Sequence, residues 1–427
     1  MLFLKECKKV ICSMTFVLFV VTVVAMYITQ YSSDLRVVVK PRPGQADYGV
    51  TIREDPGLIM SAAVDSLLGE YLSGNYTAYP IGLYKNVRLK ESKRLKMRAV
   101  LEELTGLSGE EIDGFDNFAE EGFIADGVDE EGNLVIGYPA MVFPEYSLPE
   151  SLTYERFLEL MGEADGLIGG GSSYAVETLA SYFGQAPMTY EEALAEYEAL
   201  MTPGELGKAY LRLHCDYMGI DLAVMPVFVA AALWQLDRRA RMQSLIYTRK
   251  SSTARIVGTR YLALVCCMSV PVLLTLLYTV YSVSGMYPQM SIGWGSGIGM
   301  ALLWLLPDIL AVSAVGILLT ELFSPLLAIF LQCVWWFLAL SRTKLTGDVG
   351  RFGLQVRHNS LGQAALWQSQ ENNFLCNRLA LTAVALLCLG LTLWLYERRR
   401  KGGMAWTNRL FFPVRRGDAE KRKVGDE

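Results

Sequence analysis

Histidine is almost missing from this 427-residue sequence, which contains only His214 and His358. Serine–histidine triads and histidine-ligated metal sites depend on this residue, so neither is expected. A Walker A nucleotide-binding loop is missing too. Residues 204–208 (GELGK) place the first glycine too close to the lysine, and Ala209 stands where Ser or Thr is needed. We therefore expect no enzymatic activity, no metal and no cofactor on this chain.

Charged residues are also scarce, at 19% of the sequence, whereas soluble domains usually contain about a quarter. Apolar residues make up 52% and gather in long runs. A helix of about 20 apolar residues is long enough to cross the hydrocarbon core of a bilayer. Six runs qualify as spans: 10–28, 218–236, 261–283, 298–319, 322–340 and 379–396. In the fifth, Pro325 leaves a short helix, for which a re-entrant segment is the alternative.

These runs predict an all-α polytopic membrane protein with about six transmembrane helices. Lys and Arg residues gather before the first run, in the loop 237–259 and in the segment 397–427. Six spans place these three regions on one side of the membrane, and basic loops mark the cytoplasmic side. Both termini are therefore expected in the cytoplasm. The loop 341–377 also carries basic residues, although the same topology places it outside.

The charge divides sharply between residues 31–216 and the rest of the chain. That segment has 32 acidic and 14 basic residues, a net charge of −18, whereas the remainder has a net charge of +13. Basic cytoplasmic loops favour membrane insertion and contact with anionic lipid headgroups. We therefore expect membrane lipids, and no nucleic acid, among the partners.

Residues 30–216 lie between the first and second runs and predict a large, acidic, α-rich extracytoplasmic domain. Cysteine is missing from residues 30–214, so a disulfide scaffold is not expected. Asp55-Pro56 has the pattern of an N-cap followed by proline at the first helical position. Three pairs have capping-box spacing: Ser108 with Glu111, Thr189 with Glu192, and Thr202 with Glu205. Two short stretches, 35–39 and 134–142, favour strands.

The loop 237–259 combines an apolar stripe with basic residues. Met242, Leu245, Ile246 and Arg249 recur at helical spacing after three arginines. A short amphipathic helix of this kind lies on a membrane surface or docks in a groove of a cytoplasmic partner. Membrane insertion accounts for the positive charge but not for the apolar stripe, which favours a partner. The candidate contact residues are Arg238, Arg239, Arg241, Met242, Leu245, Ile246 and Arg249.

Pro307 and Asp308 stand near the middle of the fourth run. A carboxylate at that depth is costly and should face protein or water, and the proline removes one helix hydrogen bond and kinks the helix. One interpretation places both residues on a translocation path. The other is that Asp308 forms a packing contact with a neighbouring helix. The sequence leaves both open.

Several local strings, taken with the order of the spans, resemble permease subunits of bacterial type-2 ABC exporters. Residues 245–252 (LIYTRKSS) and 260–263 (RYLA) are similar to the loop that leads into the third span of these permeases. Further similar strings are 304–308 (WLLPD), 319–322 (LTEL), 335–337 (WWF), 357–362 (RHNSLG) and 377–379 (NRL). The resemblance covers roughly residues 1–29 and 217–400.

The resemblance implies a permease subunit in the bacterial plasma membrane, paired with a separate cytoplasmic ABC ATPase that binds the ATP and Mg. Two permease subunits, identical or different, would form the translocation path. The expected organisation is a short cytoplasmic N-terminus and first span (1–29), the extracytoplasmic domain (30–216), spans two to six (217–396) with the coupling loop 237–259, and a basic cytoplasmic tail (397–427).

One departure is the N-terminus, where many such permeases carry an amphipathic helix that this short segment is not expected to form. That departure leaves the loop 237–259 as the main candidate contact with an ATPase. The alternative function is a non-transporting membrane sensor, or a scaffold of a secretion complex, whose extracytoplasmic domain binds a ligand.

Overall fold

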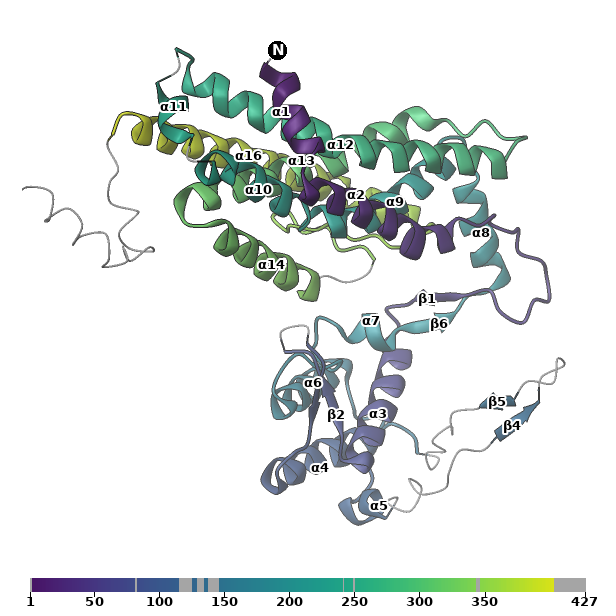
Figure 1. Cartoon of the computed structure of the whole chain (residues 1–427). Helices are drawn as coiled ribbons and strands as arrows, with labels where there is room; N and C mark the ends of the chain where they lie inside the picture. The colour runs from purple at the N-terminus through teal and green to yellow at the C-terminus, as the bar shows by residue number, and fades with distance from the viewer. Residues whose placement is uncertain are drawn as a thin grey trace, which may run out of the picture. The chain divides into compact units, whose positions relative to one another are not determined.

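The chain divides into two compact units, one formed by residues 1–40 and 194–427 and the other by residues 41–193. The structure, a computed structural model, describes residues 2–80, 83–114, 125–128, 134–136, 146–240, 242–248, 250–342 and 346–402 (Figure 1). It is 70% helical. The strands of the described part form three antiparallel pairs, each of two strands. The predicted domain 30–216 is therefore wider than the compact unit, because both of its ends belong to the first unit, called the helical unit below.

Four helices of the helical unit are long and apolar enough to cross a membrane: α2 (Met14–Met26) continued to Asp34, α12 (Thr253–Met286), α13 (Trp294–Leu322) and α16 (Glu371–Arg400). The pair α9 (Glu205–Leu222) and α10 (Pro226–Arg239) counts as a fifth span if taken together. α14 (Pro325–Arg342) is a shorter apolar helix, and α15 (Ala364–Ser369) is a six-residue helix before α16. The chain is thus a helical, membrane-embedded protein, and the count of six spans stays a prediction.

The second predicted run is not one straight helix. α9 ends at Leu222, and α10 begins after a three-residue turn and is bent by 42° from α9. Pro226 is the first residue of α10. Proline has no N–H to donate to the preceding turn, and the interruption between the two helices lies directly before this residue. Reading 218–236 as one uninterrupted run overlooked this proline.

The N-terminal segment also differs from expectation. Residues 2–11 form a separate helix, α1 (Leu2–Ile11), which ends where Ser13 caps α2. Glu6 and Val10 are buried, while Lys8 and Lys9 are exposed. The N-terminus therefore does form a short two-sided helix, and it packs against α12.

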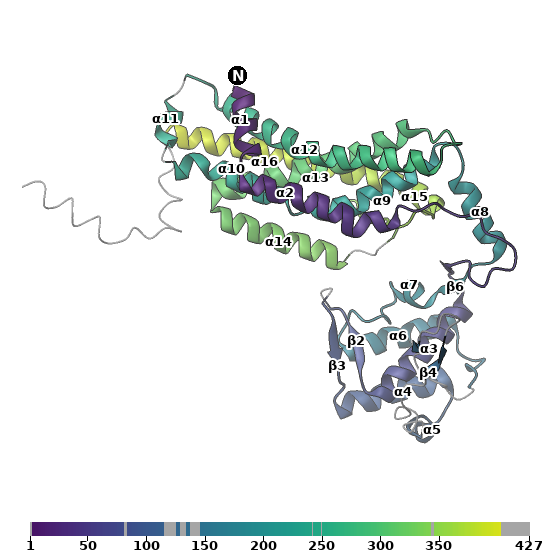
Figure 2. The same cartoon turned by 45° about the vertical axis from the view of Figure 1, so that its right-hand side comes forward.

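α13 is the central helix of the helical unit, and α9, α10, α12, α14 and α16 all contact it (Figures 1 and 2). It is apolar on all sides, as expected of a helix enclosed by other helices. Pro307 lies inside α13, which remains one continuous helix. Small residues permit close contact, and a Cβ added at Gly316 would lie 2.9 Å from the Val227 side chain of α10.

The unit 41–193 has its own core. α3 (Pro56–Ser73), α4 (Glu91–Thr105) and α6 (Tyr154–Ile168) pack their apolar faces together, with Leu67, Leu101 and Phe157 fully buried. The remaining elements are α5 (Gly109–Asp113), α7 (Leu179–Phe183), α8 (Tyr190–Leu200), which crosses the boundary between the units, β1 (Val50–Ile52), β2 (Tyr76–Ala78), β3 (Lys85–Val87), β4 (Ala125–Val128), β5 (Leu134–Ile136) and β6 (Gln185–Pro187). β1 pairs with β6, β2 with β3, and β4 with β5.

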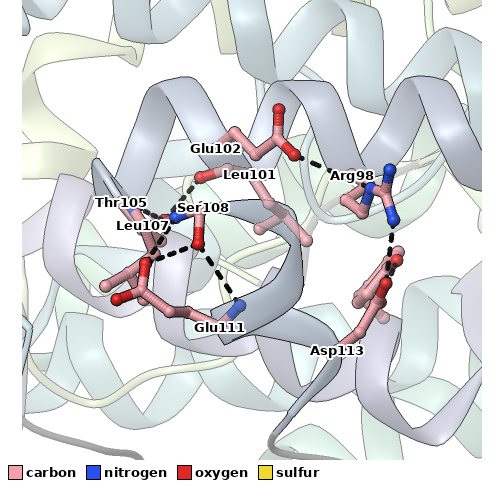
Figure 3. Close-up of polar contacts among 9 residues, drawn as sticks. Arg98, Leu101, Glu102, Thr105, Leu107, Ser108, Glu111 and Asp113 are labelled. Carbon is pink, nitrogen blue, oxygen red and sulfur yellow. Dashed lines mark hydrogen bonds and ion pairs between the residues drawn. The ribbon is translucent and has the colours of Figure 1, made fainter.

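Most of the predicted helix starts in this unit are confirmed. Asp55 caps α3 by accepting a hydrogen bond from the Gly57 backbone N–H at 2.9 Å. Figure 3 shows Ser108 and Glu111 in a complete capping box, beside the ion pair of Arg98 with Asp113 at 2.9 Å. Thr189 and Glu192 exchange the same two bonds, at 3.2 and 2.8 Å.

Three local predictions fare differently. α9 has Gly204 at its N-cap, so Thr202 does not cap it. Residues 35–39 form no strand and have no regular structure. The Val38 backbone N–H donates to the Tyr287 hydroxyl rather than to a neighbouring strand. Of the predicted strand 134–142, β5 covers 134–136, and the remainder lies outside the described residues.

The close approach at Gly316 predicts a contrast within one helix. Gly316→Ala should lower the melting temperature of the purified protein, because overpacking costs about 1–3 kcal/mol against a helix-propensity gain of about 0.5–1 kcal/mol. Gly299→Ala in the same helix should leave it unchanged or raise it, because a Cβ there meets nothing within 4 Å. Tryptophan fluorescence during thermal unfolding in detergent measures both. Equal gains in the two variants would contradict the packing of α10 on α13.

Candidate functional site

Asp308 lies in the middle of α13 and is fully enclosed, with 2% of its surface exposed. Its partner is Arg378 of α16, whose Nη1 donates to Asp308 Oδ1 at 2.9 Å. The same Nη1 donates to the Trp304 carbonyl at 2.8 Å, while Nε and Nη2 donate to Asn377 Oδ1 at 3.0 and 2.6 Å. The carboxylate is thus neutralised by a cation that donates four hydrogen bonds.

One of the two interpretations of Asp308 expected a contact with a neighbouring helix, and the bond from Arg378 is such a contact. A buried ion pair is stable only if geometry and further hydrogen bonds offset desolvation, and Arg378 meets this requirement by donating four hydrogen bonds. The contact that Asp308 makes is a helix-packing contact between α13 and α16. Arg378 was not among the predicted site residues. It immediately precedes the sixth run, and an arginine at the edge of an apolar helix is a signal that could have pointed to it.

A second buried pair closes the end of α9. Asp216 accepts from Arg357 Nε at 2.9 Å and from its Nη2 at 3.2 Å, and from the His358 backbone N–H at 2.8 Å. Arg212, one turn earlier, donates to the carbonyls of Leu361 and Gly362 at 3.0 and 3.1 Å. The segment 346–370 is therefore fastened onto α9 by two arginines, neither of which the sequence identified.

Aromatic rings fill the space between these two ion pairs. Trp304 of α13 and Trp367 of α15 stack with centroids 5.3 Å apart and planes 4° from parallel, and the Arg212 guanidinium lies 5.7 Å from the Trp367 ring. The His358 ring stands edge-to-face with the Trp367 ring, with centroids 5.5 Å apart. Burial, assisted by Arg212, lowers the pKa of His358 to about 4, so this imidazole is neutral at pH 7 and fits beside a cation.

The opposite end of α13 is organised around Glu321, which is 2% exposed. Arg238 of α10 donates from Nη2 to Glu321 Oε2 at 2.7 Å, and the Trp234 indole donates to the same oxygen at 2.6 Å. Arg399 of α16 pairs with the other carboxylate oxygen. Arg260 of α12 likewise pairs with Asp237. Arg238, predicted as a partner contact, is therefore committed to the interior of the helical unit.

The predicted amphipathic helix is shorter than expected. α11 (Gln243–Tyr247) has five residues and is separated from α10, which ends at Arg239. Within it Leu245 is 53% exposed and Ile246 is half-buried, while Met242 just before it is 45% exposed. Arg239 is exposed at the end of α10. Arg241 and Arg249 lie outside the described residues.

α11 is fastened to the end of α16. Arg400 donates from Nε to the Tyr247 carbonyl at 3.0 Å and from Nη1 to the Ser251 carbonyl at 2.6 Å. The Tyr247 ring stands edge-on to Tyr396, with centroids 5.4 Å apart. The exposed Leu245 thus sits on a short helix whose far end is held by α16. This exposed helix and the Asp308–Arg378 pair are the two candidate sites that the structure describes in detail.

Within the described ranges, no three His, Cys, Asp or Glu side chains come together as metal ligands. Comparison with models of protein families, with curated proteins and with solved structures finds no match to this chain.

The buried pair generates a double-mutant prediction. Asp308→Asn should destabilise the protein by about 3–5 kcal/mol, because it leaves the Arg378 guanidinium buried without a carboxylate. Adding Arg378→Gln should recover much of that loss, since two neutral amides need no charge compensation. Thermal unfolding of both single variants and the double variant in detergent measures the coupling. Strictly additive losses would show that the two side chains do not depend on each other.

Proposed function

We propose that this chain is the membrane-spanning permease subunit of an ATP-driven exporter of the bacterial type-2 ABC class. The strings at 245–252, 304–308 and 357–362 support this, as does a helical unit with four long apolar helices and one bent pair. The observation that carries the proposal is an exposed apolar side chain, Leu245, on a short helix fastened to the bundle. On this proposal α11 docks in a groove of a separate cytoplasmic ATPase, which binds ATP and Mg, and a second permease subunit completes the path.

The contacts give the proposed docking helix a physical connection to the centre of the bundle. α11 is held by Arg400 and Tyr396 of α16, and α16 also carries Arg399, which pairs with Glu321 of α13. The same two helices are joined by Arg378 and Asp308. A partner that moves α11 would therefore displace α16 first. Movement of α16 would then act on the ion pair that joins it to α13.

On this proposal the termini are cytoplasmic, and the segment 346–370 lies at the outer end of the bundle. Asp216, Arg357 and Arg212 then hold a closed outer face. Opening that face would require the Asp216–Arg357 bond to break or to move as one body with α9. Because a buried charge cannot be left unpaired cheaply, the two ends of the path would rearrange in discrete steps.

A non-transporting membrane sensor or secretion-complex scaffold is the second candidate. The pairing of Asp308 Oδ1 with Arg378 favours it, because a paired carboxylate has less capacity to contact a passing substrate. In that case the unit 41–193 would bind the ligand, and no ATPase would be associated with the chain.

The docking helix predicts which single change separates the two candidates. Leu245→Asp should weaken ATPase binding roughly 30- to 1000-fold, the equivalent of about 2–4 kcal/mol for a lost buried leucine contact. Membrane insertion should be unchanged, because the basic residues around the loop remain. The tagged chain is purified from its native membrane, and the copurifying ATPase is identified and quantified by mass spectrometry.

Phe352→Asp is the matched control, because Phe352 is 86% exposed in the segment 346–370, which the proposal places at the outer end of the bundle. It should retain the ATPase at the wild-type level. Retention of the ATPase by Leu245→Asp would place the docking surface elsewhere. If wild type copurifies no nucleotide-binding protein, the exporter proposal fails and the sensor or scaffold takes its place.

A further inference from the structure

A cavity of about 560 Å³ lies between α10 and the start of α14, a volume within the range of small-molecule sites. Phe228, Ala231 and Ala232 line it from one face of α10. Leu327 and Ile329 of α14 line the opposite side. The two alanines leave the space open, because larger side chains at their positions would fill it. Since apolar side chains line both sides, most of the cavity wall is apolar.

The polar lining comes mainly from Arg239, Gln235 and Ser324, with Thr15 of α2. Among the described residues that line the cavity, Arg239 alone carries a charge. The Gln235 side-chain oxygen is buried without a hydrogen-bond partner in the described part of the chain. The cavity thus joins an apolar chamber to one cation, with an unused polar group between them.

Arg239 differs from its neighbours in what it contacts. Arg238 and Arg399 pair with Glu321, and Arg260 pairs with Asp237. Arg239 is exposed, and within the described ranges no carboxylate pairs with it. It stands at the end of a membrane-embedded helix, close in sequence to these other basic groups, where lipid headgroups meet the protein.

We propose that this cavity binds one anionic membrane phospholipid, with its phosphate at Arg239 and an acyl chain against the apolar faces of α10 and α14. The sign of the charge selects an anion, because the described lining offers one arginine and no carboxylate. The apolar chamber selects a ligand with a hydrocarbon chain, because a soluble phosphate would leave it unfilled. Basic pockets between membrane helices recognise anionic headgroups by this combination. The assignment does not depend on the exporter proposal.

The test uses the purified full chain in detergent, mixed with phosphatidylglycerol or with phosphatidylcholine, and counts bound lipid by native mass spectrometry. Wild type should retain phosphatidylglycerol in preference to phosphatidylcholine. Arg239→Gln should lower the affinity for phosphatidylglycerol about fivefold, the usual effect of one basic residue at a lipid headgroup. Ala232→Phe should lower it as well, by filling the acyl-chain space while leaving the charge in place.

Arg255→Gln is the control, because Arg255 is exposed in the same basic region but does not line the cavity. It removes the same charge and should leave lipid retention unchanged. Size-exclusion elution confirms that each variant is folded, and the two test variants act at different ends of the cavity, so a folding defect in one leaves the other informative.

Two results would overturn the assignment. Equal retention of phosphatidylglycerol by wild type, Arg239→Gln and Ala232→Phe would mean that the cavity does not hold the lipid. Displacement of phosphatidylglycerol by sodium phosphate, but not by sodium chloride at the same ionic strength, would mean that Arg239 binds a soluble anion, for which the acyl-chain space is irrelevant.

Discussion

A membrane interior offers no water to a buried charge, and the pair formed by Asp308 and Arg378 satisfies that constraint at the centre of the helical unit. Apolar contacts between membrane helices carry little information about register, because lipid tails are as apolar as the helices themselves. An ion pair does carry it, since Nη1 and Oδ1 must meet within 2.9 Å. The pair therefore determines which faces of α13 and α16 meet and at what height. The Trp304 carbonyl and Asn377 Oδ1 accept hydrogen bonds from the other N–H groups of Arg378.

The same logic recurs at both ends of the bundle. Glu321 draws α10 and α16 onto the end of α13, and Asp216 draws the segment 346–370 onto α9. Each carboxylate is almost fully buried and has at least one arginine partner. The helices are thus positioned by three polar fixed points, with apolar packing filling the space between them. Because α16 contributes an arginine to two of the three, it is held to α13 both at the middle of that helix and at its Glu321 end.

Much of the fold was predictable from local sequence, and the reason is physical. α12, α13 and α16 follow from long apolar runs, and the caps at Asp55 and Ser108 follow from side chains that act within three residues. The misses arise where the outcome depends on distant residues or on one breaker inside an apolar run. The run 218–236, which composition alone joined, is interrupted by a bend of 42° just before Pro226. The partners of Asp308 and Asp216 lie 70 and 141 residues away along the chain, and no local pattern assigns either arginine to its carboxylate.

The basic residues near α10 show why a charge pattern alone overstates a docking surface. Arg238 and Arg239 are adjacent in the sequence and look equivalent, yet successive residues of a helix point about 100° apart. That rotation turns Arg238 inward to Glu321 and leaves Arg239 exposed beside the cavity of α10 and α14. Membrane insertion needs only the total positive charge, so selection for topology is satisfied by either arrangement. The fold then divides the arginines between interior ion pairs and surface contacts, and that division is what a sequence pattern cannot express.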